Sequence, residues 1–137
     1  MLTKVEIDKE RVRSILEMAE HSEKYIKLLL EKISLQEHQT PLVRDYYEVI
    51  RELATAVLLS NGLKATGDNA HKETIDNLRN YGEFSEEEIL EIQDLRIKRN
   101  KSAYEGKPIK SPYLENKKAK LDKIILKLKM IVNKNIK

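Results

Sequence analysis

The 137-residue sequence contains no cysteine and no tryptophan, and only one phenylalanine. The lack of cysteine excludes disulfide frameworks, thiolate catalysis, and zinc or iron–sulfur centres held by thiolates. Glycine and proline are also scarce, with four and three residues, and they fall between helical patterns. The chemistry left to the chain is that of carboxylate, imidazole, hydroxyl and guanidinium groups.

Long apolar runs are missing as well. No uncharged stretch approaches the ~20 residues that a bilayer span needs, and the N-terminus alternates charged and apolar residues where a signal peptide has a continuous apolar segment. We therefore predict a cytoplasmic protein with no membrane partner. The length fits one domain, so residues 1–137 are expected to form a single domain.

Charge is spread unevenly along the chain. The net charge is +3, but residues 107–137 hold ten lysines against Glu115 and Asp122, a local balance of +8. The rest of the chain is therefore acidic. Such a basic segment either attracts a polyanion such as RNA or docks on its own acidic domain. Its regular apolar stripe favours a docked helix with solvated lysines.

Apolar residues recur at steps of three and four along five segments, which is the spacing of one buried stripe on a helix. The predicted helices span about residues 8–34, 40–61, 69–80, 85–106 and 111–135. Because the connections are short, neighbouring helices should be antiparallel, so we predict an all-α, up-and-down four-helix bundle with an additional short helix. No segment alternates with a period of two, so no sheet is expected.

Several of these helices have start or stop signals. Thr40 and Ser111 each precede a proline, which combines a capping hydroxyl with a first-turn proline. Ser85 with Glu88 three residues later forms the pattern of a capping box. Gly106 is placed to end the fourth helix. These signals predict helix starts at Thr40, Ser85 and Ser111.

The second predicted helix carries more apolar residues than one face can bury. Val43, Tyr47, Ala54 and Leu58 lie outside its main stripe. A surplus of this kind is typical of a helix that contacts a second subunit. We therefore predict a homodimer.

The most informative side chains lie near the end of the fourth helix. At about 100° per residue, Arg99 falls within roughly 20° of Ile92, inside the apolar stripe, and a guanidinium there needs partners. Arg96, Asn100 and Tyr104 lie four residues apart on one side of the same helix. Two interpretations stay open. Arg99 snorkels and pairs with a helix end or an acid such as Glu88, or the cluster binds a phosphate or nucleotide.

Other candidate sites are weaker. Glu17 and His21 are four residues apart, which is not the spacing of a di-iron site in a helical bundle, and no glycine-rich phosphate loop is present. We therefore predict no metal and no cofactor. His71 with Asp76 has the residue types of a base and its orienter, but a capping or first-turn role near Asp68 is the interpretation that we favour.

The residues around Arg99 resemble the signature of the HEPN domain family, usually written R-x4-6-H with a polar residue after the arginine. Other segments of the chain also resemble this family. They are Leu58–Gly62 at a helix end, His71-Lys72 at the start of a short helix, and the aromatic residues Tyr81 and Phe84. The resemblance implies a homodimer whose signature helices face each other across a composite cleft. In several branches that cleft cuts RNA without metal. In other branches the domain partners a small nucleotidyltransferase in toxin–antitoxin or related modules.

Tyr104 stands where the family has histidine, and a phenol with a pKa of about 10 is a poor general base at pH 7. Our leading hypothesis is a HEPN-like dimeric module that binds a nucleotide or RNA at Arg96, Arg99, Asn100 and Tyr104 and acts with a nucleotidyltransferase. One alternative is a metal-independent RNase with Arg99 and Tyr104 as the candidate catalytic residues and some group other than histidine as the base. The other is a purely structural helical adaptor.

Overall fold

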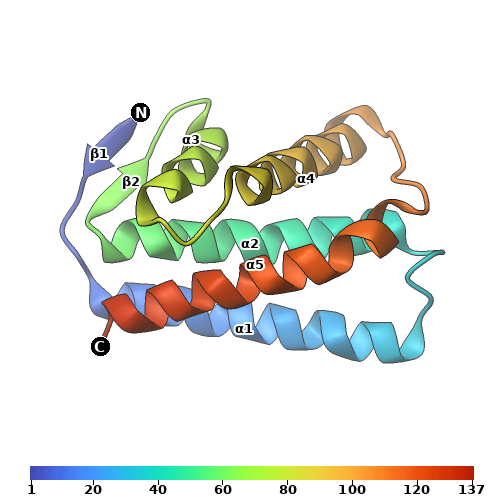
Figure 1. Cartoon of the computed structure of the whole chain (residues 1–137), viewed down its shortest axis with the longest axis horizontal. Helices are drawn as coiled ribbons and strands as arrows, with labels where there is room; N and C mark the ends of the chain where they lie inside the picture. The colour runs from blue at the N-terminus through green and yellow to red at the C-terminus, as the bar shows by residue number, and fades with distance from the viewer.

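The computed structural model describes residues 1–137 and is an all-α helical bundle, as the periodicity predicts (Figure 1). Its helices are α1 (Lys9–Lys32), α2 (Gln39–Ser60), α3 (Ala70–Asn77), α4 (Glu86–Glu105) and α5 (Tyr113–Asn135). In Figure 1 the helices α1 and α4 run in one direction, and α2 and α5 run in the opposite one. None of the helices is both long and apolar enough to cross a bilayer.

Local signals in the sequence account for several helix ends. The carboxylate of Asp8 accepts a hydrogen bond from the backbone N–H of Arg11 at 3.1 Å and caps α1. The predicted capping box of α4 is confirmed, since Ser85 Oγ accepts from Glu88 N at 3.1 Å and Glu88 Oε1 accepts from Ser85 N at 2.9 Å. Gly106 ends α4 with a φ of 66°, a left-handed conformation that glycine adopts without strain.

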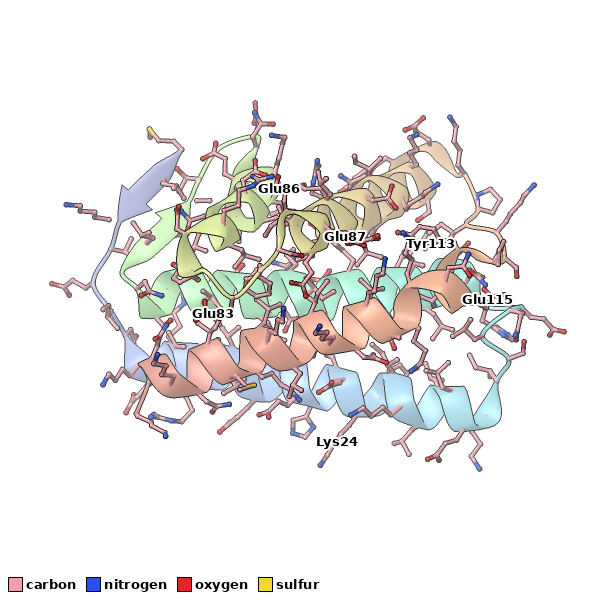
Figure 2. The ribbon with its side chains drawn as sticks, in the orientation of Figure 1. Lys24, Glu83, Glu86, Glu87, Tyr113 and Glu115 are labelled. Carbon is pink, nitrogen blue, oxygen red and sulfur yellow. The ribbon has the colours of Figure 1, made fainter.

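The predicted caps at Thr40 and Ser111 are wrong. Helix α2 already begins at Gln39, and Thr40 Oγ1 instead accepts from the backbone N–H of Ile109 at 2.9 Å. Helix α5 begins two residues after Ser111, and the Ser111 hydroxyl donates to Glu115. Figure 2 labels Glu115 in the first turn of α5. The partner of Thr40 comes from a distant segment, which no local pattern reveals, whereas Ser111 bonds to a side chain only four residues further along the chain instead of to a backbone N–H.

A side chain of α2, and not Ser111, caps the start of α5. The backbone N–H of Leu114 donates to the side-chain oxygen of Gln39 at 2.8 Å, and the Gln39 amide donates to Glu115. Gln39 is only 3% exposed, so its carboxamide is a buried polar group with partners on both sides. This pair of contacts joins the first turns of α2 and α5.

The structure also contains a small sheet, which corrects the expectation of none. Strand β1 (Leu2–Lys4) pairs antiparallel with β2 (Leu63–Ala65), with Thr3 opposite Lys64. Three-residue strands are too short for a two-residue alternation to be recognised in a sequence. The pairing holds the N-terminal segment beside the loop that leads to α3 (Figure 1).

Helix α2 is the centre of the bundle and packs against α1, α3, α4 and α5. Val43, Tyr47 and Ala54 are 0% exposed and Leu58 is 1% exposed within one chain. These were the residues from which a dimer was predicted. Their burial shows that a central helix needs apolar residues all round, so they give no support to a second subunit.

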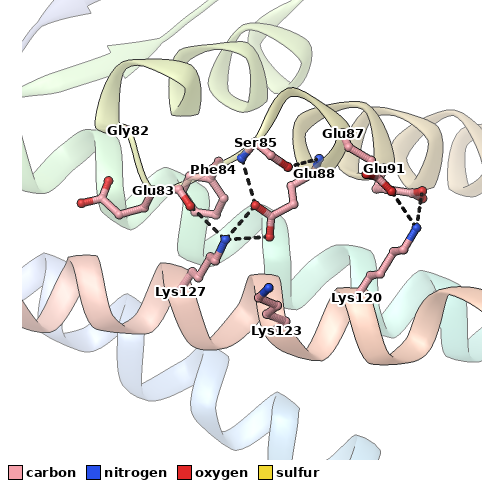
Figure 3. A pocket seen from close by; sticks show the side chains of 10 residues that line it. All are labelled: Gly82, Glu83, Phe84, Ser85, Glu87, Glu88, Glu91, Lys120, Lys123 and Lys127. Carbon is pink, nitrogen blue, oxygen red and sulfur yellow. Dashed lines mark hydrogen bonds and ion pairs between the residues drawn. The ribbon is translucent and has the colours of Figure 1, made fainter.

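Helix α5 docks on the rest of the domain, as its amphipathic pattern favours. Leu121, Ile124, Ile125 and Leu128 are buried. Many of its lysines bind acids on other elements or on α5 itself, and the ion pairs are Lys117–Glu91 at 2.8 Å, Lys118–Asp122 at 2.7 Å, Lys120–Glu87 at 2.8 Å, Lys127–Glu88 at 2.7 Å and Lys129–Glu23 at 2.6 Å. Figure 3 shows the contacts of Lys120 and Lys127 with the start of α4.

Candidate functional site

The four residues singled out in the sequence line one pocket. Arg96, Arg99, Asn100 and Tyr104 form one wall from the second half of α4. The opposite wall is the segment 67–72, which comprises the loop before α3 and the first turn of that helix. The pocket has a volume of about 300 Å³. A single face of one helix supplies the first wall because residues four apart along a helix are neighbours.

Arg99 is the centre of this pocket. Its Nη1 donates to Asn100 Oδ1 at 3.1 Å and lies 3.5 Å from the Tyr104 hydroxyl. Its guanidinium carbon lies 5.4 Å from the centre of the Tyr47 ring and 5.8 Å from that of Tyr104, which is cation–π geometry. The other guanidinium nitrogens make no hydrogen bond, so most of its five N–H donors are available.

The charge of Arg99 has only one ion-pair partner, which is at the limit of the ion-pair distance and is shared with Arg51. The nearest carboxylate is Glu48, whose Oε2 lies 4.0 Å from Arg99 Nη2, and Arg51 also binds Glu48. The predicted partner Glu88 is bound to Lys127 instead. The Arg99 side chain is only 22% exposed. A mostly buried guanidinium without a close acid favours the binding of an external anion over a purely structural role.

The remaining charged groups leave the pocket positive. Arg96 donates through Nε to Gln93 at 2.8 Å, which orients its guanidinium without neutralising it. Lys72 forms an ion pair with Asp76 at 3.2 Å, and that acid offsets most of its charge. Asp68 is the only carboxylate that lines the pocket. The two arginines therefore outnumber the acid, and the electrostatics favour an anionic ligand.

His71 also belongs to this site, although the sequence pattern did not predict a site role for it. It lies in the first turn of α3 and lines the same pocket as Arg99. Its first-turn position beside Asp68 is as predicted, but it does not cap α3, and Asp76 does not orient it because that carboxylate binds Lys72, Arg79 and Gln93. The sequence pattern indicates a helix start near His71, but it cannot indicate that α3 packs against α4.

The protonation state of His71 follows from its surroundings. Burial lowers the pKa of its imidazole below the ordinary value of 6.5, and the positive charges of Arg51 and Arg99 lower this pKa further. The carboxylate of Glu48 acts in the opposite direction and is the weaker influence. His71 is therefore neutral at pH 7 and can accept a proton or a hydrogen bond.

Helix α2 forms a polar layer behind the pocket. The hydroxyl of Tyr47 and one oxygen of Glu52 are buried and have no hydrogen-bond partner. Burial raises the pKa of Glu52, and the neighbouring charge of Glu48 adds to the increase. Burial likewise raises the pKa of Tyr47, against the lowering influence of Arg96 and Arg99. The layer holds polar groups that are only partly satisfied, which is common near binding sites.

A second, smaller pocket of about 170 Å³ adjoins the first. The two share Ala70 and His71, and the smaller one is half lined by hydrophobic side chains such as Leu58 and Leu63. Arg51 and Thr55 supply polar groups at its wall. A positive pocket beside a more apolar one suits a ligand with an anionic part and a flat apolar part.

No group of three or more His, Cys, Asp or Glu side chains is placed to hold a metal ion. In comparisons with known proteins, no family model matched the chain, and no curated protein or solved structure showed significant similarity to it. The resemblance to the HEPN family therefore stays a prediction made from the sequence.

Proposed function

We propose that this chain is a HEPN-like binding module that holds the phosphate of a nucleotide or of RNA in the pocket around Arg99. One observation carries the proposal. Arg99 is mostly buried, its nearest carboxylate is 4.0 Å away, and its free donors line a positive pocket. The planar guanidinium offers a fork of N–H donors that matches two phosphate oxygens.

Two neighbours of Arg99 support a nucleotide over a simple inorganic anion. Tyr104 is 76% exposed, so its ring can stack on a base while its hydroxyl stays beside the guanidinium. The apolar pocket beyond His71 gives a second place for a base or ribose next to the phosphate site. Asn100 adds an amide that can bond to a base edge or a phosphate oxygen.

The experiment that tests this proposal is a titration with uridine monophosphate. Binding should be measurable by calorimetry for the wild type and should weaken by about tenfold or more in Arg99→Ala, since a charge-assisted pair is lost. The matched control is Arg11→Ala, which removes the same charge from an exposed position at the start of α1. Equal affinity in all three proteins contradicts the proposal.

The assembly state and the partner are also proposals, because they follow from the HEPN resemblance. Leu90 and Ile97 are exposed on α4 and lie seven residues apart, which supports a contact between two copies of this helix. Light scattering should give about twice the chain mass of 16.0 kDa. We further propose that the dimer acts with a small nucleotidyltransferase in a toxin–antitoxin or related module, which co-purification with such a protein encoded next to this one tests.

The position of His71 favours one second candidate, a metal-independent endoribonuclease. A neutral imidazole in the pocket can take the proton from a ribose 2′-hydroxyl as that oxygen attacks phosphorus, while Arg99 stabilises the charge of the pentavalent phosphate. The P–O5′ bond then breaks, the 5′-oxygen takes a proton from water and leaves as a 5′-hydroxyl, and the other product is a 2′,3′-cyclic phosphate; His71 then returns its proton to the solvent. Cleavage of RNA in excess chelator that is lost in both His71→Gln and Arg99→Ala supports this function. No cleavage by the wild type leaves the binding function alone.

A further inference from the structure

A second positive pocket lies at the connection between α4 and α5, away from the Arg99 pocket. Its volume is about 340 Å³. The lining residues are Lys98 and Lys101 of α4, Lys107, Pro108, Ile109 and Lys110 of the connection, and Tyr113 of α5. Four of these seven residues are lysines and none is an acid. Figure 2 places Tyr113 where the connection enters α5.

The lysines of this pocket differ from those along α5. Only Lys107 has an ion pair, a 3.5 Å contact with Glu105 in which both side chains are more than half exposed. Lys98 lies over the Tyr113 ring, with Nζ 5.4 Å from its centre. Lys101 and Lys110 contact no carboxylate. By contrast, Figure 3 shows lysines of α5 that lie among acids of α4. Unneutralised positive charge therefore gathers at the α4–α5 connection.

The lysine pocket and the Arg99 pocket lie on either side of one exposed helix face. At about 100° per residue, Lys101 is roughly 60° around α4 from Tyr104, and Lys98 is roughly 60° further. Tyr104 itself lines the Arg99 pocket and is the most exposed large hydrophobic side chain of the helix. An α-helix is about 10–12 Å wide, so a single strand of nucleic acid can cross it and reach both pockets.

We infer that the lysine pocket is a second phosphate-binding site and that the ligand of this protein is an RNA strand longer than a mononucleotide. The strand crosses the last turn of α4, about two turns beyond Ile97 of the proposed dimer contact, with phosphates in both pockets and a base stacked on Tyr104 between them. Positive grooves interrupted by an aromatic ring are how proteins hold single strands without reading sequence. An acidic protein partner is less suited, because the pocket offers few apolar groups to anchor one. The inference rests on the proposed phosphate site at Arg99.

The test compares two triple variants of equal charge. One is Lys98→Gln/Lys101→Gln/Lys110→Gln, and the control is Lys24→Gln/Lys27→Gln/Lys32→Gln on the exposed side of α1. Figure 2 shows Lys24 on the side of the molecule opposite α4. Fluorescence anisotropy with a short labelled oligouridylate gives the affinity at several salt concentrations, and calorimetry with uridine monophosphate gives the affinity of the Arg99 pocket alone.

The expected result follows from counter-ion release, which contributes about 0.7 to the slope of log affinity against log salt for each phosphate contact of a single strand. Loss of three contacts lowers the slope by about 2, and at about 0.15 M salt the affinity for oligouridylate falls by about 50-fold. The α1 variant should bind like the wild type. Both triple variants should bind uridine monophosphate as the wild type does.

Two outcomes overturn the inference. Equal loss of oligouridylate binding in the two triple variants shows a general effect of net charge, and unchanged binding in the α4 variant shows that the lysines do not contact the strand. Failure of the Arg99 site is seen separately, as uridine monophosphate binding that Arg99→Ala does not weaken. Lys110→Gln alone, outside every helix, should still lower the slope by about 0.7, so the test does not depend on the folding of the triple variant.

Discussion

Replacement of Arg99 by alanine distinguishes two roles for this residue, a ligand-binding residue and a structural ion-pair clamp. The change removes two cation–π contacts, at 5.4 and 5.8 Å, and one hydrogen bond to Asn100 at 3.1 Å. Contacts of these kinds contribute about 0.5–1 kcal/mol each. The gain in helix propensity is a few tenths of a kcal/mol, and the release of a poorly paired charge adds to it. At the low end of these values, which suits a partly exposed pocket, the three losses sum to about 1.5 kcal/mol, so the net loss of stability should be about 1 kcal/mol.

A clamp would behave differently. Truncation of one partner in a close buried ion pair costs about 3–5 kcal/mol, because the other charge is left without a partner. For a chain of this length, 1 kcal/mol corresponds to a change of about 3–5 °C in the Tm. The binding hypothesis therefore predicts a loss of less than about 5 °C in Arg99→Ala, whereas a clamp predicts a loss of about 10 °C or more.

Thermal unfolding with and without uridine monophosphate provides the measurement. A ligand at about 100 times its Kd stabilises the folded state by about 2.7 kcal/mol, which raises the Tm of the wild type by about 8 °C or more. Arg99→Ala should show no such increase. A large drop in the Tm of Arg99→Ala, together with no ligand effect in either protein, would refute the assignment of Arg99 to a phosphate site.

Three further substitutions test the Arg99 pocket, the layer behind it and the docking of α5 on α4. The pKa of His71 is lowered in the folded state. Its contribution to the stability of the fold is therefore complete above the unfolded pKa of 6.5 and is lost as the pH falls below that value. Urea titrations should show that acidification lowers the stability of His71→Gln less than that of the wild type. Tyr47→Phe removes a buried hydroxyl without a partner and should raise the free energy of unfolding by about 1 kcal/mol, and a clear loss would show that this hydroxyl is bonded. Lys127→Met breaks the contacts with Glu88 and should cost about 1–2 kcal/mol, whereas the exposed neighbour Lys123→Met should change stability by less than about 0.5 kcal/mol (Figure 3). Equal effects of the two lysine substitutions would contradict this ion pair.

The sequence by itself determined the helices and one wall of the site. Apolar periodicity and the Ser85–Glu88 capping box are local properties, and they predicted the all-α fold and the start of α4 correctly. Arg96, Arg99, Asn100 and Tyr104 share a pocket wall because the repeat of a single helix brings them together. No knowledge of tertiary packing is needed for either result.

Only the tertiary structure decided which partners these elements meet. His71 lines the Arg99 pocket because α3 packs on α4, and the two residues are 28 positions apart in the sequence. Gln39 caps α5 across an even longer separation, while Thr40 is drawn away from its own helix start by Ile109. Contacts between distant segments depend on how whole helix faces fit against each other, and a local pattern carries no record of that fit.

The same reason explains the two surface interpretations that changed. The apolar surplus of α2 predicted a dimer, but the helix is surrounded by its own chain, and this environment is a property of the whole bundle. The lysines of residues 107–137 form one basic segment in the sequence, whereas the fold neutralises most of those on α5 with acids and leaves Lys110, at the α4–α5 connection, without an ion pair. Charge and burial in three dimensions are set by which surfaces meet, and that is decided only when the helices pack.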